Sequence, residues 1–125
     1  MNTIISTLKA PKAVGPYSQA VLSGNLLFVS GQMPLDPVSG IIVGSTIREQ
    51  TIRVLENMRE IILEAGFPFS SIVKCTCFLQ NMNDFAAFND EYAKYFSEFA
   101  PARECVEVVK LPKGAFVEIS AICAK

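Results

Sequence analysis

The stretch QAVLSGNLLFVSG, residues 19–31, predicts a β-hairpin whose second strand has to be covered on both faces. Two apolar runs flank residues 23–25, where Ser, Gly and Asn tolerate the positive φ of a tight turn. The second strand would span Leu26 to Gly31. Because side chains alternate along a strand, its apolar residues fall on both sides: Leu26 and Phe28 on one, Leu27 and Val29 on the other.

Helix and strand patterns follow this hairpin along the chain. Apolar residues recur at spacings of three and four from Ser45 to Ala65, which predicts an amphipathic helix. A second helix, from Asn83 or Asp84 to about Phe99, carries an aromatic stripe that we assign to the core. The remaining predicted strands lie near Ile4–Thr7, Ile72–Gln80, Arg103–Lys110 and Phe116–Cys123, the last two forming a strand pair around the turn LPKG.

This order of elements predicts an α+β subunit, in which two helices pack on one face of a mixed six-stranded sheet. The 125 residues fit one domain, 1–125. Half of them are apolar and only 18% are charged, which is more apolar surface than a small monomer buries easily. Two helices cannot cover both sheet faces, so we expect another subunit to cover the second one.

Charge and hydropathy exclude several classes of partner. Eleven basic residues stand against twelve acidic ones, a net charge of −1 without long runs, which argues against nucleic-acid binding. No apolar run reaches the roughly 18 residues of a membrane span, and the first 14 residues lack the pattern of a signal peptide. We therefore expect a soluble, cytoplasmic protein without a membrane partner.

Histidine is absent, which removes every Ser-His, Cys-His and His-metal arrangement. Cys75 and Cys77 share one strand face, but a zinc site needs further soft or imidazole ligands nearby. We interpret them as small buried core residues and expect neither a metal nor a cofactor.

Arg103 and Glu118 stand out because each interrupts a strand that otherwise looks buried. If the two strands pair, both side chains could share a half-polar pocket. One interpretation is a cross-strand ion pair, which is common in sheets. The other is a ligand site, where the arginine fork holds a carboxylate and the glutamate handles a water molecule. Strand alternation alone favours the ion pair.

Five segments spread over nearly the whole chain carry a family resemblance: GPYSQA (15–20), VSGQMPLDP (29–37), NDFAAFN (83–89), PARECVEV (101–108) and LPKGAFVEI (111–119). In content and order they resemble the signature segments of the RidA family, also called YjgF or translation-inhibitor L-PSP proteins. The resemblance implies a chorismate-mutase-like subunit in a homotrimer with three clefts between neighbouring subunits. It also implies hydrolysis of reactive enamines and imines, such as 2-aminoacrylate from pyridoxal-phosphate enzymes, to 2-keto acids and ammonia.

The resemblance also assigns site residues. Arg103 resembles the residue that binds the substrate carboxylate, assisted by the backbone at Cys105, and Glu118 the one that positions or activates water. The remaining pocket residues would be Tyr17, Ser30, Gly31 and Asn89. Each also has a plain structural interpretation. Tyr17 could be a loop aromatic, Ser30 and Gly31 could end a strand with Gly31 in a turn conformation, and Asn89 could be an exposed polar position. Cys105 would be a pocket wall, or a thiolate favoured by the nearby cation.

Three functions are compatible with these features. The first is the imine and enamine deaminase. The second is a regulator that binds small carboxylates or keto acids without catalysis. The third is an endoribonuclease or translation inhibitor, a label that the family carries. It is the weakest on physical grounds, because the chain lacks both a basic surplus and histidine.

Overall fold

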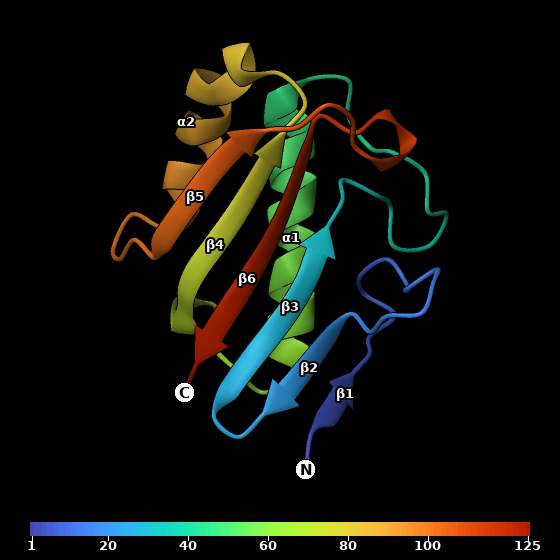
Figure 1. Ribbon diagram of the computed structural model, residues 1–125, viewed down its shortest axis with the longest axis vertical. Coiled ribbons are helices and arrows are strands. Elements are labelled where there is room, and N and C mark those ends of the chain that lie inside the picture. Colours follow the sequence, from blue (N-terminus) through green and yellow to red (C-terminus); the bar gives the residue numbers. More distant parts are fainter.

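The computed structural model describes residues 1–125 and has two layers, a six-stranded sheet and a pair of α-helices (Figure 1). The strands are β1 (Thr3–Ile5), β2 (Ala20–Ser23), β3 (Leu26–Gln32), β4 (Ile72–Leu79), β5 (Ala102–Glu107) and β6 (Val117–Ala124), and the helices are α1 (Ile47–Glu64) and α2 (Phe85–Tyr95). Both helices lie behind the sheet in Figure 1. The predicted α+β architecture, with both helices on one face, is confirmed.

The strands follow the order β1-β2-β3-β6-β4-β5, and only β4 and β5 run parallel. The expected pairing of the last two strands is wrong, because β4 lies between β5 and β6. Helix α2 carries the chain from β4 back to the start of β5, which therefore runs parallel to β4 on its outer side. Strand β6 then fills the gap between β3 and β4, antiparallel to both.

Helix α1 is the main support of the covered face. The Thr46 side chain caps its start by accepting the Glu49 N–H at 3.2 Å, and Glu49 accepts the Ser45 N–H in return. The chain leaves the helix through Gly66, whose φ of +82° favours glycine. The predicted helix is confirmed to within two residues, and its apolar stripe is buried against the sheet: Val54, Leu55, Met58, Ile61 and Ile62.

Asn57, buried on the same helix, fixes the loop that follows β3. Its side-chain amide donates to the carbonyl oxygens of Met33 and Leu35, at 3.1 and 2.9 Å. A loop would otherwise leave these carbonyls dependent on water. The segment after β3, where the predicted residues Ser30 and Gly31 lie, is thereby anchored to the core.

Helix α2 ends at Tyr95, four residues before the predicted end. The aromatic spacing continues past it because Phe96 and Phe99 pack on the core from non-helical chain, Phe96 stacking on Phe69 at 5.4 Å. The aromatic stripe is confirmed as part of the core, and so are the buried positions of Cys75 and Cys77.

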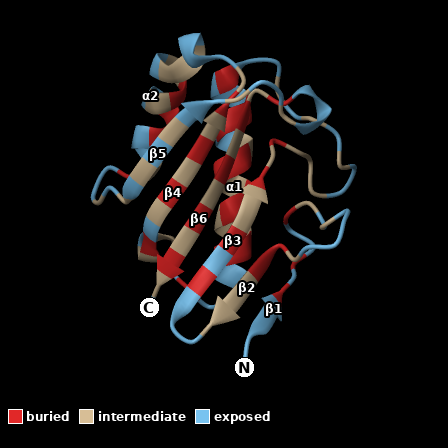
Figure 2. Cartoon of the chain, viewed as in Figure 1, coloured by how far each residue is buried: buried red, intermediate tan, exposed pale blue.

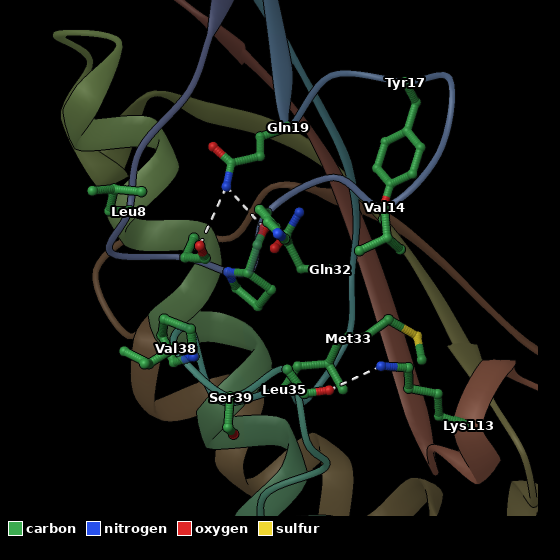
Figure 3. Close-up of a pocket in the computed structure, with 16 residues that line it drawn as sticks. Leu8, Val14, Tyr17, Gln19, Gln32, Met33, Leu35, Val38, Ser39 and Lys113 are labelled. Carbon is green, nitrogen blue, oxygen red and sulfur yellow. Dashed lines mark hydrogen bonds between the residues drawn. The ribbon is translucent and has the colours of Figure 1, made fainter.

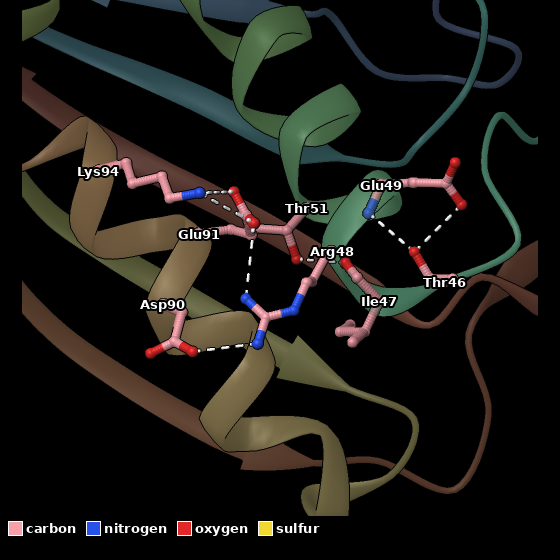
Figure 4. A network of polar contacts seen from close by, with 8 residues as sticks. All are labelled: Thr46, Ile47, Arg48, Glu49, Thr51, Asp90, Glu91 and Lys94. Atoms are coloured by element: carbon pink, nitrogen blue, oxygen red, sulfur yellow. Dashed lines mark hydrogen bonds and ion pairs between the residues drawn. The ribbon is translucent and has the colours of Figure 1, made fainter.

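A polar network fixes α2 against α1 (Figure 4). Arg48 on α1 contacts Asp90 at 3.1 Å and the buried Glu91 at 3.6 Å. Lys94 approaches Glu91 at 3.2 Å from one turn further along α2. Two cations thus compensate one buried carboxylate, which would be costly to bury without such partners. Asn89 lies on the stretch of helix that this network holds in place.

The second face of the sheet is uncovered in the single chain. Buried residues alternate with more accessible ones along β3, β4 and β6 (Figure 2). Phe28 is 43% exposed, and Ile4 on β1 and Val106 on β5, the two edge strands, are exposed as well. The prediction that two helices leave one apolar face open is therefore confirmed. No helix combines the length and apolarity that a membrane span requires.

Candidate functional site

A first cluster of predicted site residues lies where β3 separates from β6. The register between these strands shifts between Val29 and Gln32, so Ser30 and Gly31 form a bulge. The Ser30 hydroxyl donates to the Ser18 carbonyl oxygen at 2.6 Å, which ties the bulge to the loop that carries Tyr17. Glu118, near the start of β6, completes the cluster.

Gly31 is required here by close approach, not by a turn conformation. Its φ lies outside the left-handed region, unlike the φ of Gly24 in the hairpin turn. A Cβ atom at Gly31 would collide with the Glu118 carboxyl group, lying 2.9 Å from its Cδ. The missing side chain therefore makes the space in which the Glu118 carboxylate lies.

Glu118 has no hydrogen-bond or ion-pair partner within the chain, although it is half-buried. Burial raises the pKa of its carboxyl group above the ordinary glutamate value. An unpaired carboxylate with a raised pKa is a candidate base or water-binding group.

We expect Gly31→Ala to displace this carboxylate. The new methyl group would force the Glu118 side chain into another rotamer, which costs about 1 kcal/mol. The carboxylate would then lie closer to solvent. Its pKa should then fall towards the ordinary value, which an NMR titration of the Glu118 side chain would measure. Gly15→Ala is the control, since a Cβ there meets only the Tyr17 ring at an ordinary 3.5 Å. An unchanged Glu118 titration in Gly31→Ala would contradict the packing argument.

The second cluster lies at the outer edge of the sheet, where β5 faces α2. One terminal N–H group of Arg103 donates to the Asn89 Oδ1 at 2.8 Å. No carboxylate lies within 4.0 Å of the Arg103 guanidinium, and Asn89 is its only hydrogen-bond partner. A half-buried arginine without a counter-ion is equipped to hold an anion with its remaining N–H groups.

Cys105 lies next to Arg103 on the same side of β5, with its thiol half-buried. Burial raises the pKa of the thiol, and the opposing effect of Arg103 is smaller, so the thiolate interpretation is not favoured.

The backbone N–H of Cys105 points away from the sheet. Val108, three residues later, donates its N–H to the Leu79 carbonyl oxygen of β4 at 2.9 Å. Because N–H groups alternate in direction along a strand, the Cys105 N–H points to the free edge of the sheet.

The two clusters lie on opposite faces of the sheet. Arg103 aligns with the buried Cys75 and contacts α2, so it lies on the helix-covered face. Glu118 aligns with Phe78, which points to the uncovered face. The shared pocket expected for Arg103 and Glu118 is therefore not formed within one chain, and no ion pair joins them. Both expectations assumed that β5 and β6 pair, whereas β4 separates them.

Each cluster borders a cavity that the sequence did not predict. A cavity of about 510 Å³ lies beside Tyr17 and Gly31, with Leu8, Val38 and Lys113 around it (Figure 3). Its walls come from the end of β3 and from three loops, and loop packing leaves no periodic signal in a sequence.

The second cavity, of about 420 Å³, contains Asn89 and Arg103. Tyr92 also lines this cavity, whereas the aromatic spacing indicated only a place in the core. The spacing of three residues from Asn89 to Tyr92 was a usable signal, because it places both on one side of the helix.

Comparison with known proteins finds relatives over the whole chain. Residues 7–125 match the family described as Endoribonuclease L-PSP. A RutC family protein of Pyrococcus horikoshii is 50% identical, over 100% of this chain and 99% of that protein. The 2-iminobutanoate/2-iminopropanoate deaminase of the goat, Capra hircus, is 48% identical, over 100% of this chain and 91% of that protein. The crystal structure of a Rid family protein of unknown function from Yersinia pestis has a TM-score of 0.96 at 44% identity, covering 100% of both chains.

Proposed function

Since the chain belongs to the Endoribonuclease L-PSP family, which includes the Rid proteins, we propose that it hydrolyses reactive imines and enamines to 2-keto acids and ammonia. The substrates would be small 2-imino acids and their enamine forms, such as 2-aminoacrylate. One observation carries the proposal: Arg103 is a half-buried cation with no carboxylate partner in its own chain. A 2-imino acid supplies that carboxylate next to its reactive carbon.

The complete site would form between subunits of a homotrimer. One subunit would contribute Arg103, Asn89 and the outward N–H of Cys105, and its neighbour Glu118 with Tyr17, Ser30 and Gly31. The positions of the two clusters support this arrangement, because they lie on opposite faces and cannot act on one small molecule within a chain. The uncovered apolar face, which includes Phe28, supports association as well.

The reaction needs an oriented water, a fixed substrate and a proton carrier. Arg103 would hold the substrate carboxylate. Glu118 would remove a proton from a water molecule as the water oxygen bonds to the imine carbon. The carbon–nitrogen double bond becomes single in the tetrahedral carbinolamine. Glu118 would give this proton to the nitrogen, which completes the carbinolamine. It would then carry the hydroxyl proton to the same nitrogen, so that the carbon–nitrogen bond breaks and ammonia leaves as the carbonyl forms. The raised pKa of Glu118 suits this exchange.

A regulator that only binds carboxylates would use Arg103 in the same way. Nothing in such a role requires a half-buried glutamate over Gly31, so the Glu118 cluster favours catalysis. An endoribonuclease would need a phosphate-binding surface, and the net charge of −1 offers little support for one.

Subunit complementation tests both the reaction and the shared site. Arg103→Ala and Glu118→Gln chains would each be inactive alone, and would then be unfolded together and refolded as a mixture. Every mixed trimer then has one cleft with both residues intact, so random mixing restores about a quarter of wild-type imine hydrolysis. Light scattering should give three times the 13.7 kDa chain mass for each protein. Inactivity of the wild-type protein would refute the deaminase, and an inactive mixture would refute the shared cleft.

A further inference from the structure

Arg103 lies against a group of aromatic rings from one side of α2. Its guanidinium carbon is 4.7 Å from the ring centroid of Tyr92, 5.6 Å from that of Phe85 and 6.0 Å from that of Phe88. The three aromatic residues and Asn89 are three or four positions apart along α2, a spacing that places their side chains on one helical stripe. The stripe that builds the core therefore also surrounds a cation.

We propose that Tyr92 is a positioning residue, which holds the Arg103 guanidinium in the orientation that binds a substrate carboxylate; this inference rests on the proposed function. The face of an aromatic ring attracts a cation, most strongly where water is excluded, and Tyr92 is only 6% exposed. Asn89 fixes one end of the guanidinium by its hydrogen bond. The ring and the amide thus limit the movement of a long side chain, while other N–H groups stay free for the ligand.

The ring of Tyr92, and not its hydroxyl group, has this role. The hydroxyl is buried without a well-formed hydrogen bond, and the nearby Cys75 thiol is only a weak partner for it. Burial raises the pKa of Tyr92, so the hydroxyl stays protonated and neutral. Phenylalanine would keep the attraction between ring and cation, and it would remove an unsatisfied polar group.

Three variants separate positioning from packing: Tyr92→Phe, Tyr92→Leu and the control Phe67→Leu. Phe67 is another buried aromatic residue, 3% exposed, but its cation is Lys125 and it borders neither cavity. We expect Tyr92→Leu to raise the Kd for pyruvate and the KM for the imine about tenfold, with a smaller effect on kcat. Tyr92→Phe should bind like the wild type. Phe67→Leu should lower the Tm without changing either constant.

A second measurement does not depend on activity. The ring current of Tyr92 should shift the Arg103 side-chain NMR signals upfield, in the wild type and in Tyr92→Phe but not in Tyr92→Leu. Equal weakening of pyruvate binding by Phe67→Leu and Tyr92→Leu would overturn the proposal, as would unchanged binding or unchanged Arg103 signals in Tyr92→Leu. If the wild type neither bound pyruvate nor hydrolysed imines, the proposed function would fail, and the proposal for Tyr92 would fall with it even where the Arg103 signals shift as expected.

Discussion

Arg103→Ala is expected to lower kcat/KM for imine hydrolysis about 10³-fold, and to weaken the binding of keto-acid products by a similar factor. Truncating one partner of a desolvated, hydrogen-bonded charge pair costs about 2–5 kcal/mol, and each 1.4 kcal/mol is a factor of ten. Every substrate and every keto-acid product in the proposed reaction carries the same carboxylate, so turnover and product binding should be lost together. Steady-state kinetics and calorimetry with pyruvate would measure the two effects.

Two further variants test whether the guanidinium fork itself is responsible. Arg103→Lys should restore little, because a point charge cannot reproduce two parallel N–H groups or the contact with Asn89. Arg59→Ala is the matched control, since Arg59 also lies over aromatic rings, those of Phe69 and Tyr95. It should change stability without changing pyruvate binding. Activity of Arg103→Ala within a few fold of wild type would refute the assignment of the carboxylate site.

The sequence predicted those elements whose signal is local. Helix α1 has a cap, a stripe and a terminating glycine, all within one stretch, and the hairpin of β2 and β3 has its turn residues between two apolar runs. The predicted pairing of β5 and β6 was wrong because strand pairing has no such local signal. Strand alternation says which residues share a face, but it does not say which strand is the neighbour. Here β4, remote in sequence, is inserted between the two.

The candidate site shows the same limit. Arg103 and Glu118 could be singled out as charges within apolar strands, but their faces depend on strand neighbours that the sequence leaves open. Gly31 looked like a strand end, whereas its role depends on Glu118, a residue 87 positions later that lies over it. The aromatic stripe of α2 was correctly assigned to the core. Its contact with Arg103 needed the position of β5, which no periodicity in α2 encodes.

Glu118→Gln is expected to lower kcat about 10²-fold or more, while pyruvate binding remains within about twofold of wild type. The amide keeps the shape of the side chain, but it cannot accept a proton from water or return one to the leaving nitrogen. This pattern differs from that of Arg103→Ala, which should lose binding and turnover together. Comparable losses of pyruvate affinity in both variants would mean that Glu118 contributes to binding and not to proton transfer.

The pH dependence of Glu118→Gln makes the same prediction sharper. In the wild type, kcat should rise as Glu118 loses its proton, with a midpoint above the ordinary glutamate pKa because burial raises the pKa of this group. The rise should be absent in the variant.

The folded state also binds this proton more tightly than the unfolded chain does, so Glu118 lowers the free energy of unfolding as pH rises from the ordinary pKa to the raised one. Glutamine removes that dependence, and at neutral pH the variant should be at least as stable as the wild type in urea unfolding. A variant that was inactive because it unfolded more easily would instead make Glu118 a structural residue, and the proton carrier would have to be sought elsewhere in the cleft.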